Sequence, residues 1–327
     1  MDLLVLGGTR FLGRHLVEDA LGRGHRVTLF NRGESNAGLS PEVEQLRGER
    51  GGDLSPLRGR SWDAAIDTSG YLPRDVKASA EILADSVEHY AFVSSISVYE
   101  DFGRIGMGED APVLTPPDPE PEEVDWELYG GLKVGCERAV GAALPGRALV
   151  VRPGMIVGPR DYTDRFPYWC RRIAEGGDVL APGDPDQQVQ IVDARDLASW
   201  MLTMAEAKKT GVYNATGPEY RLTTRGMLEG IRDAAESDAR FVWASEEFLL
   251  ECDVKPWEEM PLWVPAEMAG VLAVDVGRAL RAGLAFRPLA ETVRDVLGSG
   301  GSSVESGAGI PREREEGLLR GWRTIKL

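Results

Sequence analysis

The chain has 327 residues and carries 37 Lys and Arg against 53 Asp and Glu, a formal net charge of −16. Hydrophobic residues make up 43% and charged residues 28% of the chain, which is typical of a globular protein with a large core. An acidic chain without a basic block is poorly suited to nucleic-acid phosphates, so we expect no nucleic-acid partner. The acidity is uneven. Residues 109–127 hold eight acids and no Lys or Arg, and residues 246–259 hold six acids and one Lys.

Cysteine and histidine are too scattered to predict a metal centre. The three cysteines, Cys136, Cys170 and Cys252, fit a reducing cytoplasm better than a disulfide framework. The three histidines leave little material for zinc ligation or a Ser-His-Asp triad. The sequence shows no signal peptide and no run of about 18 apolar residues that could span a membrane. We therefore expect a cytoplasmic protein without a metal site or a membrane partner.

Short apolar runs alternate with amphipathic segments along the first half of the chain. The runs that predict buried strands are residues 3–6, 27–30, 64–66, 89–94 and 148–151. The segments that predict helices are the stretch that carries Leu12, Leu16, Val17, Ala20 and Leu21 and closes at residues 22–24, the region near residues 75–86, and the stretch that carries Leu132, Cys136, Ala139 and Val140. This alternation predicts an α/β fold, a doubly wound parallel sheet of the Rossmann type.

The alternation loosens after residue 153. Helices near 165–175 and 194–205, with a short strand at 212–214, predict a smaller C-terminal substrate lobe interleaved with the sheet. The expected organisation has three parts. They are a mainly dinucleotide-binding core over 1–160, a mainly substrate-binding lobe over 161–297, and a linker with a C-terminal helix over 298–327. Residues 298–309 are rich in Gly and Ser and predict the linker.

A glycine-rich loop, GGTRFLG, occupies residues 7–13 between the first predicted strand and helix. Gly7 permits a tight turn, Gly13 permits close helix–strand packing, and the helix N-terminus then faces a pyrophosphate. Arg10 replaces the usual middle glycine, and a plain strand–helix turn is the alternative interpretation. The residues that we expect to contact the cofactor here are Gly7, Thr9, Arg10, Phe11, Leu12 and Gly13.

The second predicted strand ends in Asn31 and Arg32, where an NAD-binding protein carries an acid for the ribose 2′-hydroxyl. Arg32, with Arg10, could instead hold a 2′-phosphate, which favours NADP over NAD. A solvated turn is the alternative role for Arg32. The further positions at which we expect cofactor contacts are Asn31 itself, Asp53 and Leu54 at the end of a third strand, and Thr68, Ser69 and Gly70 after the 64–66 strand.

Tyr129 and Lys133 are spaced i, i+4 at the start of a predicted helix, so both side chains project from one face. Ser95 follows the strand that precedes this helix. A Tyr-x-x-x-Lys pair alone is weakly specific, and an exposed helix start is its structural alternative. The order of glycine loop, strand-terminal serines, Tyr-x-x-x-Lys and Arg152-Pro153-Gly154 is more specific.

These motifs resemble the extended or atypical short-chain dehydrogenases/reductases, the NAD(P)-dependent epimerase/dehydratase family. The matching segments are GGTRFLG (7–13), SSISVY (94–99), YGGLK (129–133), RPGMIVGPRD (152–161), QIVDARDLA (190–198) and VYNATGPE (212–219). They run in the family's order over residues 1–220. The resemblance is specific for the fold and less specific for the substrate.

The resemblance implies a role for each of these side chains. Tyr129 is the general acid/base, and Lys133 holds the nicotinamide ribose and lowers the pKa of Tyr129 from its reference value of about 10. Ser95 hydrogen-bonds the substrate oxygen, with Ser97 as an alternative. Pro153 and Gly154, which follow a predicted strand, border the nicotinamide. A homodimer through the Tyr129 helix is a further family expectation.

The sequence departs from the family's pattern on the substrate side. Ile96 and Ser97 replace the Asp-Glu pair of the sugar dehydratases, and Met155 and Gln187 replace an Asn and an Arg of many sugar-nucleotide enzymes. These changes disfavour a UDP- or dTDP-sugar. Arg165 and Trp169 are substrate candidates together with Ser97 and Met155. The alternative is that the helix containing Arg165 and Trp169 buries its aromatic residues in the core.

We therefore expect an NADP(H)-dependent oxidoreductase that interconverts a carbonyl and an alcohol on a small or natural-product-like substrate. The alternatives are an NAD-dependent sugar epimerase and a non-catalytic dinucleotide-sensing or RNA-binding relative. The acidic segment 109–127 runs directly into Tyr129. If it forms the rim of the site, it favours a neutral or cationic substrate; a solvated Pro-rich loop is the alternative.

Overall fold

Alternating residues of the first strand are buried on opposite faces of one sheet. The computed structural model describes residues 1–34, 41–299 and 307–325. In β1 (Asp2–Leu6), Leu3 and Val5 pack in one apolar cluster, and Leu4 and Leu6 pack in another. Such a strand needs cover on both faces, which helical crossovers between parallel strands provide.

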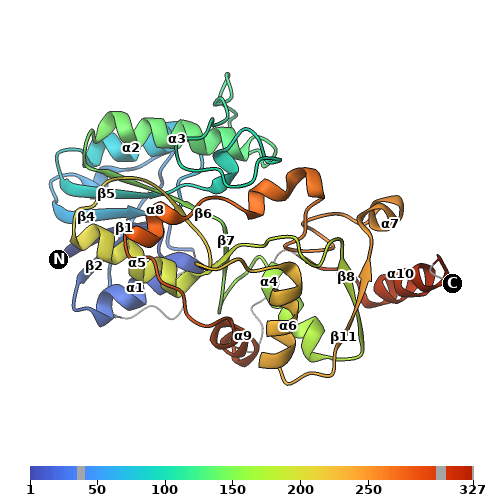
Figure 1. Ribbon diagram of the computed structural model, residues 1–327. Helices are drawn as coiled ribbons and strands as arrows, with labels where there is room; N and C mark the ends of the chain where they lie inside the picture. The colour runs from blue at the N-terminus through green and yellow to red at the C-terminus, as the bar shows by residue number, and fades with distance from the viewer. Residues whose placement is uncertain (35–40, 300–306, 326–327) are drawn as a thin grey trace.

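Within the described residues, seven parallel strands form the main sheet, in the order β10-β6-β5-β4-β1-β2-β3 (Figure 1). The strands beside β1 are, in chain order, β2 (Arg26–Asn31), β3 (Glu44–Arg47), β4 (Trp62–Asp67), β5 (Val87–Val93), β6 (Ala148–Pro153) and β10 (Gly211–Ala215). The strand order reverses between β1 and β4, and ligands of such folds bind beyond the carboxyl ends of the strands at this point. The predicted doubly wound α/β fold is confirmed.

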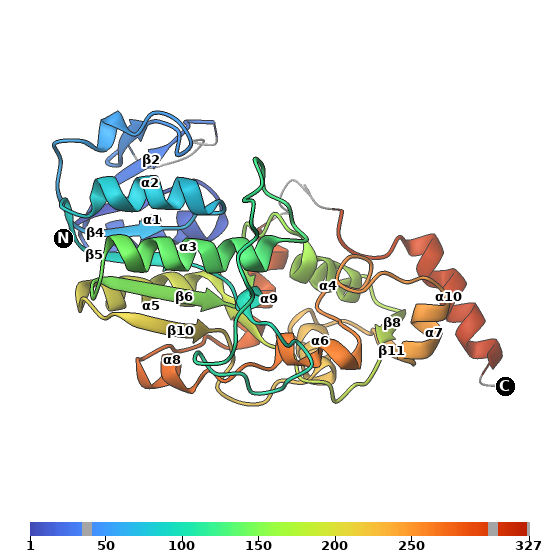
Figure 2. The same cartoon turned by 90° about the horizontal axis from the view of Figure 1, so that it is seen from above.

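Two layers of helices cover the sheet. On one face α1 (Phe11–Gly22) packs against α5 (Ala194–Glu206), and on the other α2 (Pro73–Leu83) packs against α3 (Tyr129–Ala143) (Figure 2). The helix predicted from Leu12 to the glycines at 22–24 is therefore present as α1, and the one predicted near 75–86 is present as α2. No helix of the described part of the chain is long and apolar enough to cross a membrane.

A smaller lobe lies beside the carboxyl ends of the sheet strands, at the right of Figure 1. Its helices are α4 (Arg165–Ala174), α6 (Thr224–Ala234), α7 (Glu246–Glu251), α9 (Leu289–Gly298) and α10 (Arg312–Ile325). Its two-stranded sheet pairs β8 (Asp178–Pro182) with β11 (Arg240–Ala244). The remaining elements are β7 (Met155–Val157), β9 (Ile191–Asp193) and α8 (Gly277–Arg281). The lobe has its own apolar core, separate from the two beside the main sheet.

Two elements expected within the lobe belong to the sheet. The strand predicted at 212–214 is β10, an edge strand of the main sheet that pairs with β6. The helix predicted at 194–205 is α5, which packs against α1. After β6 the chain leaves the main sheet and forms α4 and β8. It then returns to the sheet with α5 and β10 before it forms the rest of the lobe. This return is the interleaving that the loosened pattern predicts.

The edge strand β3 ends at Arg47, earlier than the third strand expected to end at Asp53 and Leu54, and the lobe helices α6 and α9 were not predicted. Strand β3 has the sequence EQLR and buries only Leu46, so no apolar run marks it. Helix α6 does carry a start signal, because the Thr223 side chain accepts a hydrogen bond from the Gly226 N–H at 3.0 Å. Local signals of this kind say little about which elements pair in space.

The predicted C-terminal helix is present as α10. Leu318 and Leu319 are buried against the lobe, and Trp322 Nε1 donates a hydrogen bond to the Trp243 carbonyl at 2.8 Å. The Glu315 side chain is only 1% exposed and pairs with Arg172 at 2.7 Å. It also accepts a hydrogen bond from the Leu180 N–H of β8 at 2.9 Å. Residues 300–306 of the predicted linker lie outside the described residues.

We expect Glu315→Gln to lower the free energy of unfolding by about 3–5 kcal/mol, because breaking a buried ion pair leaves its partner charge uncompensated. The control is Glu316→Gln on the same helix, whose carboxylate is 52% exposed and whose removal should change stability by less than about 0.5 kcal/mol. Urea unfolding measures both. Equal losses in the two variants would contradict this account of how α10 docks.

Candidate active site

A cavity of about 940 Å³ lies at the carboxyl edge of the sheet, where the strand order reverses. The glycine loop forms one wall. Gly7 has a φ of +98°, and a Cβ on Gly13 would lie 2.7 Å from the Gly8 Cα, so only glycine allows α1 to approach β1 this closely. The resulting cradle fits the pyrophosphate of a dinucleotide at the start of α1.

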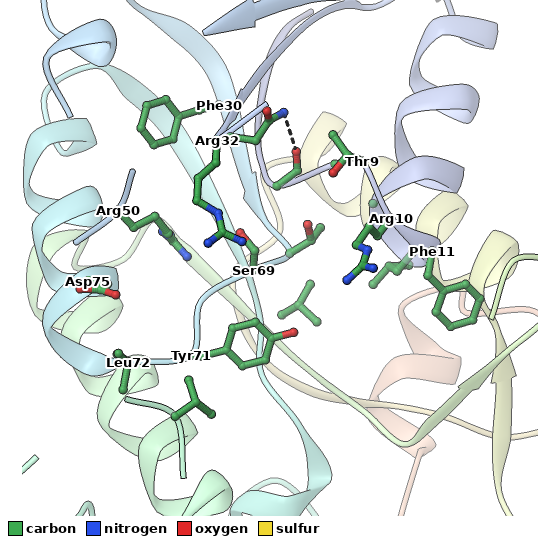
Figure 3. A pocket seen from close by; sticks show the side chains of 18 of the residues that line it. Thr9, Arg10, Phe11, Phe30, Arg32, Arg50, Ser69, Tyr71, Leu72 and Asp75 are labelled. Atoms are coloured by element: carbon green, nitrogen blue, oxygen red, sulfur yellow. Dashed lines mark hydrogen bonds between the residues drawn. The ribbon is translucent and has the colours of Figure 1, made fainter. Parts of the chain in front are cut away.

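Most of the predicted cofactor residues line this one cavity (Figure 3). Those that do are Gly7, Thr9, Arg10, Phe11, Leu12, Gly13, Asn31, Arg32, Thr68, Ser69, Tyr129, Lys133, Pro153 and Gly154. Gly70 is not among the lining residues, and its carbonyl instead accepts a hydrogen bond from Lys133 Nζ at 2.6 Å. Segments far apart in the sequence therefore meet at the switch point.

Asp53 and Leu54, predicted to contact the cofactor at the end of a strand, lie neither at the end of β3 nor among the residues that line the cavity. Strand β3 ends at Arg47, six residues before Asp53, and it is residues 48–51 that line the cavity. Asp53 is exposed, and its carboxylate accepts the Ser55 N–H of its own turn at 2.9 Å. A Cβ on Gly48 would lie 2.5 Å from the Phe30 ring, so glycine at this position marks where the chain turns toward the cavity.

Arg50 is the cavity residue whose role the sequence did not reveal. Its guanidinium donates to both carboxylate oxygens of the fully buried Asp67, one of them at 2.9 Å, and to Ser79 Oγ at 2.9 Å. Tyr90 also donates to Asp67, at 2.9 Å. Burial opposes the charge on Arg50, but the Asp67 carboxylate raises its pKa overall. This network holds the Arg50 guanidinium in place in the cavity wall.

Ser95, Tyr129 and Lys133 line the same cavity as the glycine loop. Tyr129 is the first residue of α3, and Lys133 lies one turn later. Lys133 Nζ donates to the carbonyls of Gly70 and Val93, at 2.6 and 2.9 Å. The Ser95 hydroxyl donates to Ser97 Oγ at 3.0 Å and accepts the Ser97 N–H at 3.1 Å. The structure thus brings together the three side chains that the resemblance selects.

The pKa of Tyr129 differs from the expected direction. Burial raises the pKa of Tyr129 to about 12, and interactions with Ser95 and Arg165 offset this only in part. Burial also lowers the pKa of Lys133. Lys133 Nζ lies 5.7 Å from the Tyr129 ring centroid and is directed at two backbone carbonyls. Desolvation therefore dominates at Tyr129, and its phenol stays protonated at neutral pH.

The predicted substrate residues do not share one location. Ser97, Met155, Arg165 and Trp169 are all absent from the lining of the described cavity. Trp169 is buried and donates its indole N–H to the Pro261 carbonyl at 2.7 Å, so the core-packing alternative holds for Trp169. Arg165 lies 5.7 Å from the Trp257 ring centroid and acts electrostatically on Tyr129, so it stays near the reacting group.

The acidic segment 109–127 divides into two parts. Glu109 is buried and accepts the Asn214 N–H of β10 at 3.0 Å, which makes it a structural residue. Glu122 and Val124 line the cavity, so the later part does form its rim. Arg74 of α2 holds this rim by donating to Glu120 at 3.1 Å and to the Pro121 carbonyl at 2.7 Å. The rim is therefore acidic and anchored.

The seven-stranded parallel sheet with helices on both faces is a Rossmann-type α/β fold. Residues 76–216 match the model of the NAD dependent epimerase/dehydratase family, the family that the motifs of the chain resemble. Within the described residues, no group of three or more His, Cys, Asp or Glu side chains is placed to hold a metal ion.

Two curated relatives are similar to the chain. The chloroplast stem-loop binding protein of 41 kDa b of Arabidopsis thaliana is 27% identical over 253 residues, 71% of this chain and 62% of that protein. The match thus spans less than two thirds of that relative's length. The epimerase family protein SDR39U1 of Bos taurus is 25% identical over 260 residues, 72% of this chain and 80% of that protein.

Solved structures share the fold at low identity. The UDP-glucuronic acid 4-epimerase from Bacillus cereus, solved in complex with NAD, aligns with a TM-score of 0.66 and 16% identity. The alignment covers 92% of this chain and all of that one. At this identity the likeness shows the fold alone.

Two glycines of α3 provide a test of how the site is built. A Cβ on Gly130 would lie 2.1 Å from the Ser97 carbonyl oxygen, whereas one on Gly141 would meet nothing within 4 Å. We expect Gly130→Ala to cost about 1–3 kcal/mol through overpacking and to lower activity by displacing Ser95 from Tyr129. Gly141→Ala should stabilise the protein by about 0.5–1 kcal/mol.

Thermal unfolding of the two glycine variants is the measurement. Both substitutions are Gly to Ala in the same helix, and they differ chiefly in the close contacts that the added methyl group makes with Ser97 and Leu114 at position 130. If both variants were stabilised alike, α3 would not depend on this close approach.

Proposed function

We propose that the protein is an NADP(H)-dependent oxidoreductase that interconverts a carbonyl and an alcohol on a small substrate. The observation that carries the proposal is that Ser95, Tyr129 and Lys133 line the same cavity as the glycine loop. A protein that only senses a dinucleotide has no need of a half-buried phenol beside a hydroxyl and a lysine. The three free cysteines suit the reducing cytoplasm that we infer as its setting.

The residues of the cavity fit a nicotinamide dinucleotide. The cradle at Gly7 and Gly13 takes the pyrophosphate, residues 48–51 border the adenine side, and Pro153 with Gly154 borders the nicotinamide side. Bound there, the cofactor supplies or accepts a hydride. The chain itself supplies binding, orientation and the proton.

Tyr129 is the proton donor in the reductive direction. With its pKa raised to about 12 by burial, the phenol is protonated at neutral pH and can donate to a substrate oxygen that gains negative charge. Ser95, whose hydroxyl lies at the same wall, donates a second hydrogen bond to that oxygen. Lys133, held by the Gly70 and Val93 carbonyls, keeps a positive charge near the phenol and reaches the ribose hydroxyls.

NADP is favoured by the arginines around the adenosine side of the cavity. Figure 3 shows Arg10 and Arg32 extending into this cavity from different elements. Arg32 is 63% exposed and pairs with the equally exposed Glu34 at 3.0 Å. Such surface pairs contribute little, so a 2′-phosphate can displace Glu34 from Arg32.

We expect Arg32→Ala to weaken NADPH binding about tenfold to a hundredfold and to leave NADH binding unchanged, because a charged hydrogen bond to phosphate is worth about 1.5–3 kcal/mol. Glu34→Gln is the control, which removes the competing carboxylate and should not weaken NADPH binding. Fluorescence titration with both cofactors measures the effect. Equal affinities for NADPH and NADH in wild type and Arg32→Ala would refute the NADP assignment.

A sugar epimerase is the second candidate, favoured by the family match and by the epimerases that share the fold. The substrate side argues against a nucleotide sugar. Gln187, at the position where many such enzymes carry an Arg, uses its amide to bind the Val264 carbonyl at 3.0 Å. Oxidised cofactor retained through purification, without net turnover on carbonyls, would favour the epimerase.

Stem-loop binding, which the name of the Arabidopsis relative states, is disfavoured for this chain. The net charge of −16 opposes binding to nucleic-acid phosphates. The rim of the cavity, where Glu122 lies, is itself acidic. A role in binding nucleic acid would also leave the half-buried Tyr129 and the buried Lys133 without a function.

We expect Tyr129→Phe to lower turnover about a hundredfold to ten-thousandfold, which is the usual contribution of a positioned proton donor. NADPH affinity should stay within about threefold of wild type, since the ring is retained and only the hydroxyl is lost. Steady-state kinetics and cofactor titration on the same preparation separate the two effects. Unchanged turnover in Tyr129→Phe would exclude the proposed mechanism.

A further inference from the structure

Trp126 is an unusually exposed tryptophan that lies beside the half-buried Tyr129. Its side chain is 71% exposed, three residues before Tyr129. Its ring centroid lies 5.5 Å from that of Tyr129 and 6.1 Å from that of Tyr71. Single exposed apolar side chains are common on proteins and need no explanation. This one continues an aromatic wall that starts inside the cavity, because Tyr71 and Tyr129 both line it.

The position of Trp126 is fixed by the chain around it. The Asp125 carboxylate accepts the Glu127 N–H at 2.9 Å, and the Tyr129 N–H bonds to the Trp126 carbonyl at 3.4 Å. Arg74 anchors the preceding residues through Glu120 and the Pro121 carbonyl. The exposed ring is therefore preorganised, and a ligand that stacks on it does not have to order the segment first.

The exposed charges beside the Trp126 ring are negative, while the cation Lys133 lies 4.8 Å from the Tyr71 ring centroid in the cavity wall. Glu122, Glu123, Asp125 and Glu127 are all exposed in the same short segment. Arg165 is the nearby cation that acts on Tyr129, and the carboxylates of Asp161 and Glu258 act on Arg165 in turn. An aromatic face flanked by carboxylates attracts a ring that bears positive charge and repels one that bears negative charge.

We propose that Trp126 and Tyr71 bind a planar aromatic ring of the substrate, that this ring carries no negative charge, and that a positive charge on it strengthens binding. The inference rests on the proposed function, since it places the ring so that an attached carbonyl or carbinol carbon reaches Tyr129. It names the substrate class, an aromatic carbonyl or alcohol that is neutral or cationic. Trp126 is then a specificity residue at the mouth of the cavity.

Four probe aldehydes test the proposal by calorimetric titration of the full chain saturated with NADP⁺. They are para-trimethylammonio-benzaldehyde, its neutral isostere para-tert-butyl-benzaldehyde, para-carboxy-benzaldehyde and the non-aromatic cyclohexanecarbaldehyde. We expect the cationic probe to bind most tightly, the neutral aromatic probe next, and the carboxylate and cyclohexane probes at least about tenfold more weakly. The advantage of the cationic probe over its isostere should shrink as salt is raised.

Variants identify the residue responsible. Trp126→Ala should weaken both aromatic probes about tenfold, whereas Trp126→Phe, which keeps a ring, should stay within about threefold of wild type. Leu250→Ala is the control, an exposed apolar side chain on α7 in the lobe, and should change nothing. Sedimentation of wild type and Trp126→Ala tests a second copy of the chain as the occupant.

Each remaining outcome overturns the inference. Equal binding of all four probes, no measurable binding, or equal affinities in wild type and Trp126→Ala would show that the ring is not a ligand site. Tightest binding of the carboxylate probe would assign recognition to Arg165 instead. Self-association lost in Trp126→Ala would make Trp126 an interface residue. Titration does not require turnover, so failure of the ring site is distinguishable from failure of the proposed reduction.

Discussion

The Lys133 ammonium group joins three elements of the sheet domain at the cavity. Its Nζ donates to the Gly70 carbonyl beyond β4 and to the Val93 carbonyl at the end of β5, while its backbone belongs to α3. The faces of Tyr71 and Phe92 lie 4.8 and 5.0 Å from the same nitrogen. Such contacts offset the cost of burying a charge. They also fix where α3 begins, and hence where Tyr129 and the aromatic wall beside it lie.

A second set of buried charges connects helix α3 to the main sheet. Arg152 of β6 pairs with Glu137 of α3 at 2.7 Å, and Ser94 Oγ donates to Glu137 at 2.5 Å. Arg152 also donates to the Glu109 carbonyl at 3.1 Å, and Glu109 binds the backbone of β10. Ser94, which precedes Ser95, the helix that begins at Tyr129 and the start of the acidic segment are thereby connected.

The parts of the fold that follow from the sequence are those with local patterns. The strands of the sheet interior, such as Leu3–Leu6, are apolar on both faces, and the glycine loop has a fixed spacing. Strand β3 is polar and lies at an edge, so the sequence could not locate its end or the cavity-lining residues Glu49 and Arg50 that follow it. Trp169 could fill a pocket or a core with the same spacing, and only tertiary packing decides. Trp126 belongs to no periodic pattern, and its place beside Tyr129 emerges from the fold alone.

The most direct test of the proposed reduction is to trace the transferred hydride with deuterium. The protein is incubated with NADPH that carries deuterium at the transferred position, together with an aromatic aldehyde, and the product is analysed by mass spectrometry. The account predicts deuterium at the carbinol carbon, stoichiometric release of NADP⁺, and loss of both in Tyr129→Phe. A product free of deuterium, or deuterium transfer that persists in Tyr129→Phe, would contradict it.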